Sequence, residues 1–478
     1  MGLSVIMGAV IMDIARTVRC VAAGLLIVGL SQTSRPAARA GEGGPMPRYR
    51  LTPGQELTYR SVTMSDRKVG KSVFNVDWKV WVVGREADGS WRLVLRCDLR
   101  TERSAPGGQK AEVEPVDTLV WRCRLFDDGR LVGATMMGTV RDPFRLFPRL
   151  PDDAVALDRG WESQGPEMEQ SRLHFRAISR PTPDHPDLVL AMTIDGPQDK
   201  VYVLTHSTRA TFDTRRGLAT RIEAEDTNGH GNKGTSKGTI ELVSVEDRGA
   251  ALTGQFGREA EAYFDAVDSY DVATERAGRD AKACQPLLAE AKKHLEEARA
   301  ALTTPVFLQA IGTKLEGHDR TAKYIVDGVA RRARFLNKPA AEWEAKDLDG
   351  KMHRLADYRG KVVILDFWYR GCGWCMYAMP QVNRVVETFR DQPVAVLGMT
   401  IDEDVKDGRV VVEAMALRYP VIQARELPEK FGVQGYPTLI VIDQHGIIRD
   451  IHFGYSPRLF EELSARVSSL LAEKAAAR

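Results

Sequence analysis

Two spacings of hydrophobic residues divide the chain, and the first is an alternation over residues 46–250. The alternation is clearest in residues 91–99 and 119–125, and an Asp-Gly turn signal lies beside each run. A period of two is typical of strands with one buried face. Further strands are expected at residues 201–204, 219–225 and 239–245. We therefore expect an all-β antiparallel sandwich or half-barrel over residues 46–250.

Residues 255–336 have the spacing of amphipathic helices instead. One apolar stripe begins at Phe256 and ends at Tyr270, and a second runs through residues 287–302 with Lys and Glu on the opposite side. Thr304 followed by Pro305 is typical of the start of another helix. The sequence predicts a helical hairpin or three-helix module, which serves either as a spacer between two domains or as a partner-docking surface.

The remaining residues, 337–478, alternate between strand and helix patterns. Residues 361–368 form a nearly continuous apolar run, as a strand of a parallel sheet requires. Helix patterns follow at residues 376–389, 410–418 and 457–473, and strand patterns at residues 394–401, 438–443 and 448–453. We expect an α/β domain here, so the whole chain is predicted to be multi-domain.

The first forty residues resemble a signal peptide rather than part of the fold. Arg16 and Arg19 precede a ten-residue apolar run, residues 21–30, and the segment ends in Ala38-Arg39-Ala40, a small-x-small cleavage pattern. The run is too short to anchor the chain in a bilayer. We expect export to the periplasm, the cell envelope or the medium, where disulfide chemistry is favoured.

Composition narrows the function further. The 478 residues carry 67 Lys and Arg against 65 Asp and Glu, a net charge of +2. This balance offers no excess of positive charge for phosphates, so we expect no nucleic-acid partner. It leaves the oligomeric state open.

The strongest chemical signal is Cys372-Gly373-Trp374-Cys375, which lies between a predicted strand and a predicted helix. This spacing puts two sulfurs within disulfide reach at a helix N-terminus, where the helix dipole stabilises a thiolate. Half of a zinc site has the same spacing. The other cysteines of the expected mature chain, Cys97, Cys123 and Cys284, provide no second closely spaced pair.

Several motifs in the same order resemble the thioredoxin superfamily. They are Leu-Asp-Phe-Trp at residues 365–368, the Cys-x-x-Cys, Pro380, and Gly-Tyr-Pro-Thr at residues 435–438. Within that superfamily, residues 339–361 resemble exported TlpA-like and ResA-like thiol:disulfide oxidoreductases. The arrangement of a β-rich export domain joined by helices to such a module resembles a planctomycete type. The resemblance implies a thioredoxin fold over about residues 337–475.

The resemblance also implies roles for individual residues. Cys372 is the nucleophile, Cys375 resolves the mixed disulfide, and Asp366 is a buried carboxylate that moves a proton to or from Cys375. Pro437 is a cis proline that faces the cysteines, and substrate contacts are expected from Tyr436, Trp374 and Trp368. Trp368 has core packing as an equal alternative. No metal or organic cofactor is required.

Two residues depart from the family pattern. Ala378 replaces the glutamate of many ResA-like reductases, and Gly398 replaces the lysine that thioredoxins place near their buried aspartate. Asp366 would then be the only buried acid beside the cysteines. Outside the motif, Cys97 and Cys123 either form a structural disulfide or remain two buried thiols, and Cys284 is expected to be a lone core thiol.

The sequence therefore predicts an exported enzyme that exchanges the Cys372–Cys375 pair with the thiols and disulfides of other proteins, and that a redox partner recycles. A peroxiredoxin-like thiol peroxidase with antioxidant activity is one alternative. Peroxiredoxins carry Pro-x-x-x-Thr/Ser-x-x-Cys, whereas Leu365 and Tyr369 hold those positions before Cys372. A non-enzymatic binding or scaffold protein is the other alternative.

Overall fold

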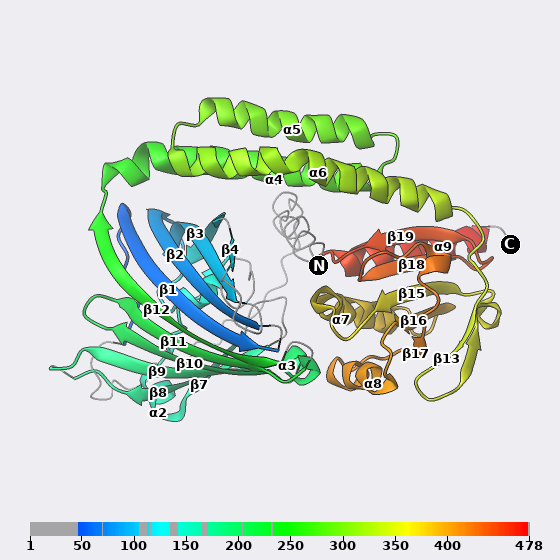
Figure 1. The fold of residues 1–478 in the computed structure, drawn as a ribbon, viewed down its shortest axis with the longest axis horizontal. Coiled ribbons are helices and arrows are strands. Elements are labelled where there is room, and N and C mark those ends of the chain that lie inside the picture. The colour runs from blue at the N-terminus through cyan, green and yellow to red at the C-terminus, as the bar shows by residue number, and fades with distance from the viewer. Residues whose placement is uncertain are drawn as a thin grey trace, which may run out of the picture.

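The structure is a computed structural model, and it describes residues 46–476 except 69, 105–111, 115, 134–141, 165–170, 183, 203 and 231–232. The signal peptide expected at residues 1–40 lies outside the described residues. Figure 1 shows a strongly curved sheet on one side, an α/β unit on the other, and long helices that run across both.

The N-terminal region is one curved antiparallel sheet, which corresponds to the half-barrel rather than to the sandwich. In the described residues its strand order is β6-β5-β3-β2-β1-β12-β11-β10-β9-β8-β7, with β4 paired to β3. The strands are β1 (Gln55–Arg67), β2 (Gly70–Arg85), β3 (Trp91–Ser104), β4 (Glu112–Val113), β5 (Asp117–Leu125), β6 (Leu131–Val132), β7 (Trp161–Gln164), β8 (Arg172–Ser179), β9 (Asp187–Asp195), β10 (Leu204–Asp213), β11 (Leu218–Asn228) and β12 (Gly234–Asp247).

Alternation along β2 shows how this sheet is covered on both faces. Val80 and Val82 belong to the main apolar core of the half-barrel. Trp81 and Val83 point to the opposite face, where they pack with residues of the helical segment such as Phe264. The period of two in the sequence therefore marks strands whose two faces meet different partners.

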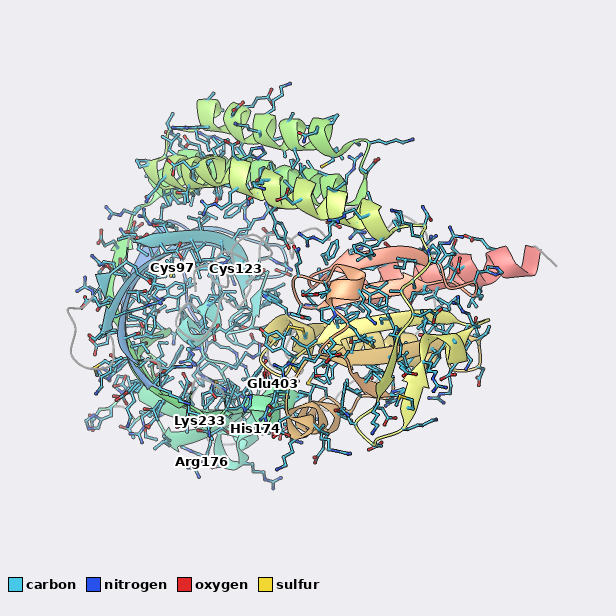
Figure 2. All side chains as sticks on the ribbon, turned by 45° about the vertical axis from the view of Figure 1, so that its right-hand side comes forward. Cys97, Cys123, His174, Arg176, Lys233 and Glu403 are labelled. Atoms are coloured by element: carbon cyan, nitrogen blue, oxygen red, sulfur yellow. A yellow bond between two sulfur atoms is a disulfide. The ribbon has the colours of Figure 1, made fainter. Side chains whose placement is uncertain are left out.

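The pairing register settles the question of Cys97 and Cys123, which Figure 2 labels on neighbouring strands. Cys97 lies opposite Leu119, and Cys123 lies opposite Leu93. The two cysteines are therefore four residues apart along the ladder, about 13 Å at 3.3 Å per residue. A disulfide needs Cα atoms within about 7 Å, so these two cysteines are not bonded to each other.

One predicted strand is wrong. Residues 201–204 were expected to be extended, but Val201 and Tyr202 end a short helix, α3 (Pro197–Tyr202), and β10 begins only at Leu204. Pro197 favours this outcome because its fixed φ suits the first turn of a helix. The side chain of Val201 is also buried against the C-terminal unit, which is a tertiary contact that alternation cannot reveal.

The helical segment forms three long helices, as one of the two predicted arrangements requires. They are α4 (Gly257–Arg279), α5 (Cys284–Ala301) and α6 (Pro305–Phe335). Two polar contacts join these helices to the C-terminal unit: Arg279 of α4 donates to Glu462 at 2.5 Å, and Arg332 of α6 pairs with Asp450. Among the helices of the described part of the chain, none combines the length and the apolar character that a membrane span needs.

The C-terminal unit is a mixed five-stranded sheet with the order β17-β16-β15-β18-β19. The central strand β15 is buried on both faces, parallel to β16 and antiparallel to β18. Helices α7, α8 and α9 cover one of these faces. The elements are β15 (Val362–Trp368), α7 (Gly373–Thr388), β16 (Val394–Thr400), α8 (Val405–Ala414), β17 (Val421–Gln423), β18 (Thr438–Ile442), β19 (Ile448–Phe453) and α9 (Leu459–Ala476), preceded by the small hairpin β13 (Glu344–Lys346) and β14 (Met352–Arg354).

Candidate functional site

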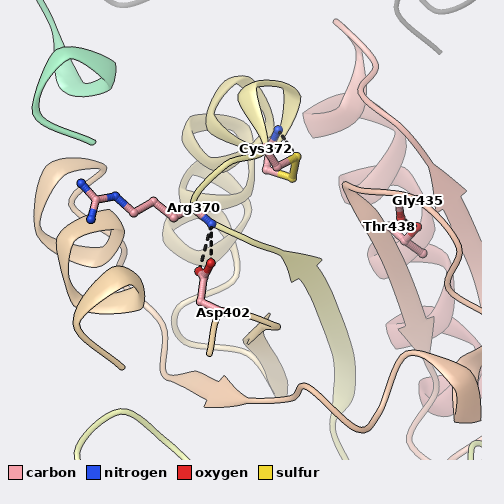
Figure 3. Close-up of a disulfide and its surroundings, with 6 residues drawn as sticks. Arg370, Cys372, Asp402, Gly435 and Thr438 are labelled. Atoms are coloured by element: carbon pink, nitrogen blue, oxygen red, sulfur yellow. Dashed lines mark hydrogen bonds between the residues drawn. A yellow bond between two sulfur atoms is a disulfide. The ribbon is translucent and has the colours of Figure 1, made fainter. Parts of the chain in front are cut away.

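A disulfide between Cys372 and Cys375 opens helix α7 (Figure 3). Cys372 is the N-cap residue, and its Sγ accepts a hydrogen bond of 3.1 Å from the backbone N–H of Cys375. The backbone amides of the first helical turn and the helix dipole also favour a thiolate at Cys372 after reduction. Only 6% of Cys372 is exposed and 1% of Cys375, so Cys372 is the more accessible residue of the pair.

The loop before β18 carries the proline that the resemblance implies. The peptide bond between Tyr436 and Pro437 is cis. Two hydrogen bonds fix the ends of this loop: Thr438 Oγ1 donates to the carbonyl of Gly435 at 2.7 Å, and Gly454 N–H donates to the carbonyl of Pro437 at 2.8 Å. The packing of Tyr436 against the apolar cluster that contains both cysteines brings this loop to the disulfide.

Aromatic rings border the disulfide on two sides. Trp374 is half-buried and stacks on Tyr455, with ring centroids 5.6 Å apart. Tyr436 meets the ring of Tyr369 edge to face at 5.4 Å. Trp368 differs from these residues because its side chain is fully buried beneath α7. While that packing holds it cannot contact a substrate, so core packing, the second alternative for Trp368, describes its position.

Asp366 lies inside the sheet, on the face of β15 that α7 covers. Its neighbours on that face, Ile364 and Trp368, both pack against α7. Only 1% of Asp366 is exposed. Burial raises the pKa of its carboxyl group to about 7, and one hydrogen bond from Tyr419 opposes the rise. A carboxyl group that titrates near neutral pH can both give and take a proton there.

Tyr419 was not identified from the sequence. Its hydroxyl donates to Asp366 Oδ2 at 3.1 Å, and both side chains are buried. Gly398 lies opposite Asp366 in the ladder between β15 and β16. A Cβ atom on Gly398 would come within 3.2 Å of the Tyr419 ring. The glycine that replaces the thioredoxin lysine thus leaves room for a neutral phenol, and this substitution was the one available signal.

Two histidines of the C-terminal unit, His353 and His452, have structural partners. His353 contacts Asp347 at 2.9 Å and Tyr358 at 2.6 Å, and His452 lies between Asp450 and Glu462. Within the described ranges, no group of three or more His, Cys, Asp or Glu side chains is arranged to hold a metal ion.

The α/β sheet, the disulfide at a helix start and the buried aspartate define a thioredoxin-like redox domain. Residues 336–451 match the AhpC/TSA family. The chain is 32% identical over 121 residues to a thiol-disulfide oxidoreductase ResA of Geobacillus thermodenitrificans, which covers 25% of this chain and 70% of that protein. It is 30% identical over 118 residues to a thioredoxin-like protein YneN of Bacillus subtilis, which covers 24% and 69%.

A solved structure titled as a putative thiol:disulfide interchange protein DsbE from Chlorobium tepidum is 25% identical, covers 28% of this chain and 97% of its own, and has a TM-score of 0.28. Through its C-terminal domain, the chain belongs to the ResA family of thiol-disulfide oxidoreductases. It is an enzyme of that class.

Proposed function

We propose that this protein is an exported oxidoreductase that exchanges its Cys372–Cys375 pair with protein thiols and disulfides in the cell envelope. The observation that carries the proposal is the disulfide at the start of α7, on the same sheet face as a carboxyl group with a pKa of about 7. Export rests on the expected signal peptide, and protein clients rest on the activity class of the relatives.

The reduced protein reacts with a client disulfide in two steps. The Cys372 thiolate attacks one client sulfur, the client S–S bond breaks, and the second client sulfur leaves as a thiolate that takes a proton from water. Asp366 in its carboxylate form accepts the thiol proton of Cys375. The Cys375 thiolate then attacks the Cys372 sulfur of the mixed disulfide.

That second attack releases the first client sulfur as a thiolate, to which Asp366 returns its proton. Two electrons have passed to the client, and the cysteine pair is again a disulfide. A partner dithiol protein restores the pair by the reverse steps, becoming oxidised itself. With a client dithiol the same steps run in the other direction, and the protein acts as an oxidant.

The loop at Pro437 supplies an edge for the client. A client segment that adds as an extended strand beside this loop would place its sulfur over Cys372. Trp374 and Tyr436 border that position on either side, so we assign them to client contact. Asp366, Cys372 and Cys375 are the residues we assign to the chemistry.

The test is equilibration of the full chain in glutathione and dithiothreitol buffers, followed by thiol trapping. We expect a reversible two-electron transition within the superfamily range of about −270 to −120 mV. Cys372→Ala should abolish thiol exchange, whereas Cys284→Ala, which removes a buried thiol at the start of α5, should leave it unchanged. A pair that never cycles would contradict the proposal and favour the scaffold alternative.

Two further measurements separate the alternatives. Peroxide consumption that depends on Cys372 and proceeds faster than exchange with protein thiols would favour the thiol peroxidase. Expression in a bacterium with a periplasm should yield a mature chain that begins at Gly41, and retention of residues 1–40 in the cytoplasm would contradict export.

A further inference from the structure

Helix α3 of the half-barrel ends inside the redox domain. The side chain of Val201 is fully buried in the apolar cluster that also contains Cys372, Cys375 and Trp368. Figure 3 shows α3 beside α8, on the side of the site toward which the side chain of Arg370 points. A residue about 170 positions upstream thus completes the packing around the disulfide.

Polar contacts hold this end of α3 in place. The guanidinium group of Arg370 donates twice to the carbonyl of Val201, from Nε at 2.9 Å and from Nη2 at 2.5 Å. Its third nitrogen pairs with Asp407 of α8 at 2.7 Å. Arg370 is itself 8% exposed, so these charge-assisted bonds form away from bulk water, where they are strongest.

The half-barrel holds the same helix from its other side. Asp199 of α3 lies 3.3 Å from His206 of β10, and His206 lies 2.8 Å from Asp226 of β11. The backbone N–H of His230 donates to the carbonyl of Tyr202 at 3.1 Å. Helix α3 is therefore a fixed projection of the sheet rather than a free loop.

The position of α3 bears on access to the site. Tyr202 packs against the same apolar cluster as Trp374 and Tyr436, the two residues assigned above to client contact. With α3 docked, Cys372 is only 6% exposed. A client must approach the sulfur between this helix end and the loop at Pro437.

We propose that the end of α3, where the buried Val201 anchors the partly exposed Tyr202, forms one wall of the client-binding site and determines which thiol proteins can react with Cys372. This inference rests on the proposed function. A cysteine in a thin, extended segment fits beside the wall. A cysteine pair on a folded surface clashes with the wall and reacts more slowly. The half-barrel is then a specificity element of the redox site.

The experiment compares two dithiols as reductants of the oxidised, full-length protein. Dithiothreitol is small enough to reach the disulfide without contacting the wall, whereas reduced thioredoxin presents its cysteines on a folded surface. Val201→Asp puts a charge into the apolar cluster and should release α3. We expect the rate with reduced thioredoxin to rise at least tenfold, while the rate with dithiothreitol changes less than twofold.

A second test variant, Arg370→Gln, and two controls, Lys200→Gln and Arg409→Gln, each change the charge by one unit, as Val201→Asp does. Lys200→Gln alters the exposed neighbour of Val201 by one unit of charge, and it should leave both rates unchanged. Arg370→Gln loosens α3 from the other domain without altering α3 itself, and it should reproduce Val201→Asp. Arg409→Gln, on the exposed side of α8, is its control.

Amide hydrogen exchange at residues 198–202 reports whether α3 is released. Free exchange in Val201→Asp or Arg370→Gln with an unchanged ratio of the two rates would overturn the proposal. If neither variant speeds amide hydrogen exchange in α3, the proposal is overturned as well, because the position of α3 would then not depend on these contacts. If neither dithiol reduces the wild-type disulfide, the proposed function itself fails.

Discussion

Asp226 in the half-barrel and Asp366 in the redox domain are buried carboxyl groups with opposite surroundings. Asp226 accepts hydrogen bonds from His206 at 2.8 Å and from Arg145 at 3.0 Å. Burial alone would raise the pKa of Asp226, but its hydrogen bonds and the two positive charges hold it below the usual value. Asp366 has a single hydrogen bond from the neutral Tyr419, and burial raises its pKa to about 7.

The two carboxyl groups show how a buried charge that supports the fold differs from a buried group that can transfer a proton. Where opposite charges surround a buried carboxylate, it stays ionised over the physiological pH range and supports the fold. Where only a phenol contacts it, the proton is shared almost evenly between bound and released states near pH 7. Only the second arrangement can serve proton transfer, and the next four predictions test that contrast.

The largest effect is expected from Asp226→Asn. The change leaves Arg145 and His206 facing a neutral amide in a buried position, so the free energy of unfolding should fall by about 3 to 5 kcal/mol. Denaturant unfolding measures this loss. Asp195→Asn, at an exposed position of β9, is the control and should change stability by less than about 0.5 kcal/mol. Equal losses in both variants would contradict the structural role of Asp226.

Asp366→Asn should change stability in the opposite direction. The folded pKa of about 7 lies above the unfolded value of 3.8, so the folded wild type binds an extra proton between these limits. Its stability therefore decreases as the pH rises from about 4 to 7, whereas an asparagine has no such dependence. The variant should gain on the order of 4 kcal/mol relative to wild type by pH 8, because each unit of the pKa difference is worth about 1.4 kcal/mol.

The same variant should exchange thiols at least about tenfold more slowly, because Cys375 loses its proton acceptor. Unfolding of the oxidised protein at pH 4 and pH 8, with exchange rates at pH 7, measures both effects. A gain in stability that does not depend on pH would show that Asp366 is ionised throughout.

Gly398→Ala should disturb the packing on which the contact between Tyr419 and Asp366 depends. The new Cβ would lie 3.0 Å from Trp368 Nε1 and 3.2 Å from the Tyr419 ring. Crowding of this kind costs about 1 to 3 kcal/mol. Gly312→Ala, in α6 where a Cβ meets nothing within 4 Å, should instead stabilise the chain slightly. Thermal unfolding of the two variants makes the comparison.

The smallest effect is expected from Tyr419→Phe. Loss of the hydroxyl removes the one hydrogen bond that favours the carboxylate, so the pKa of Asp366 should rise by about one further unit. The pH profile of thiol exchange should shift upward by the same amount. Tyr455→Phe, on the far side of Trp374, should leave the profile in place, and an equal shift in both variants would rule out a specific role for Tyr419.

The redox domain was predictable because its motifs are local in sequence. The strand before Cys372, the helix after it and the tract around Pro437 each combine a periodic pattern with fixed spacing, and the family pattern orders them. The burial of Asp366 followed from its place in a continuous apolar strand. Even the departure at Gly398 was visible, although it did not show which side chain fills the space.

Tyr419 and α3 could not be predicted for a common reason. Tyr419 reaches Asp366 from 53 positions away, and α3 reaches the site from the other domain. Neither contact leaves a periodicity in its own segment. The alternation that continues into residues 201–204 predicts a strand, and only docking against the redox domain buries Val201 in a helix. Long-range packing overrides local preference at both places.

Helix α6 also affects the equilibrium between docked and displaced α3. It runs as one continuous helix of 31 residues, about 46 Å at 1.5 Å per residue, from the half-barrel to its contact with β19 (Figure 1). Such a strut keeps α3 near its docking position at an effective concentration that no dilution lowers. A client with a folded surface therefore competes with a tethered helix, and it displaces α3 only when its concentration and its own contacts together outweigh that effective concentration.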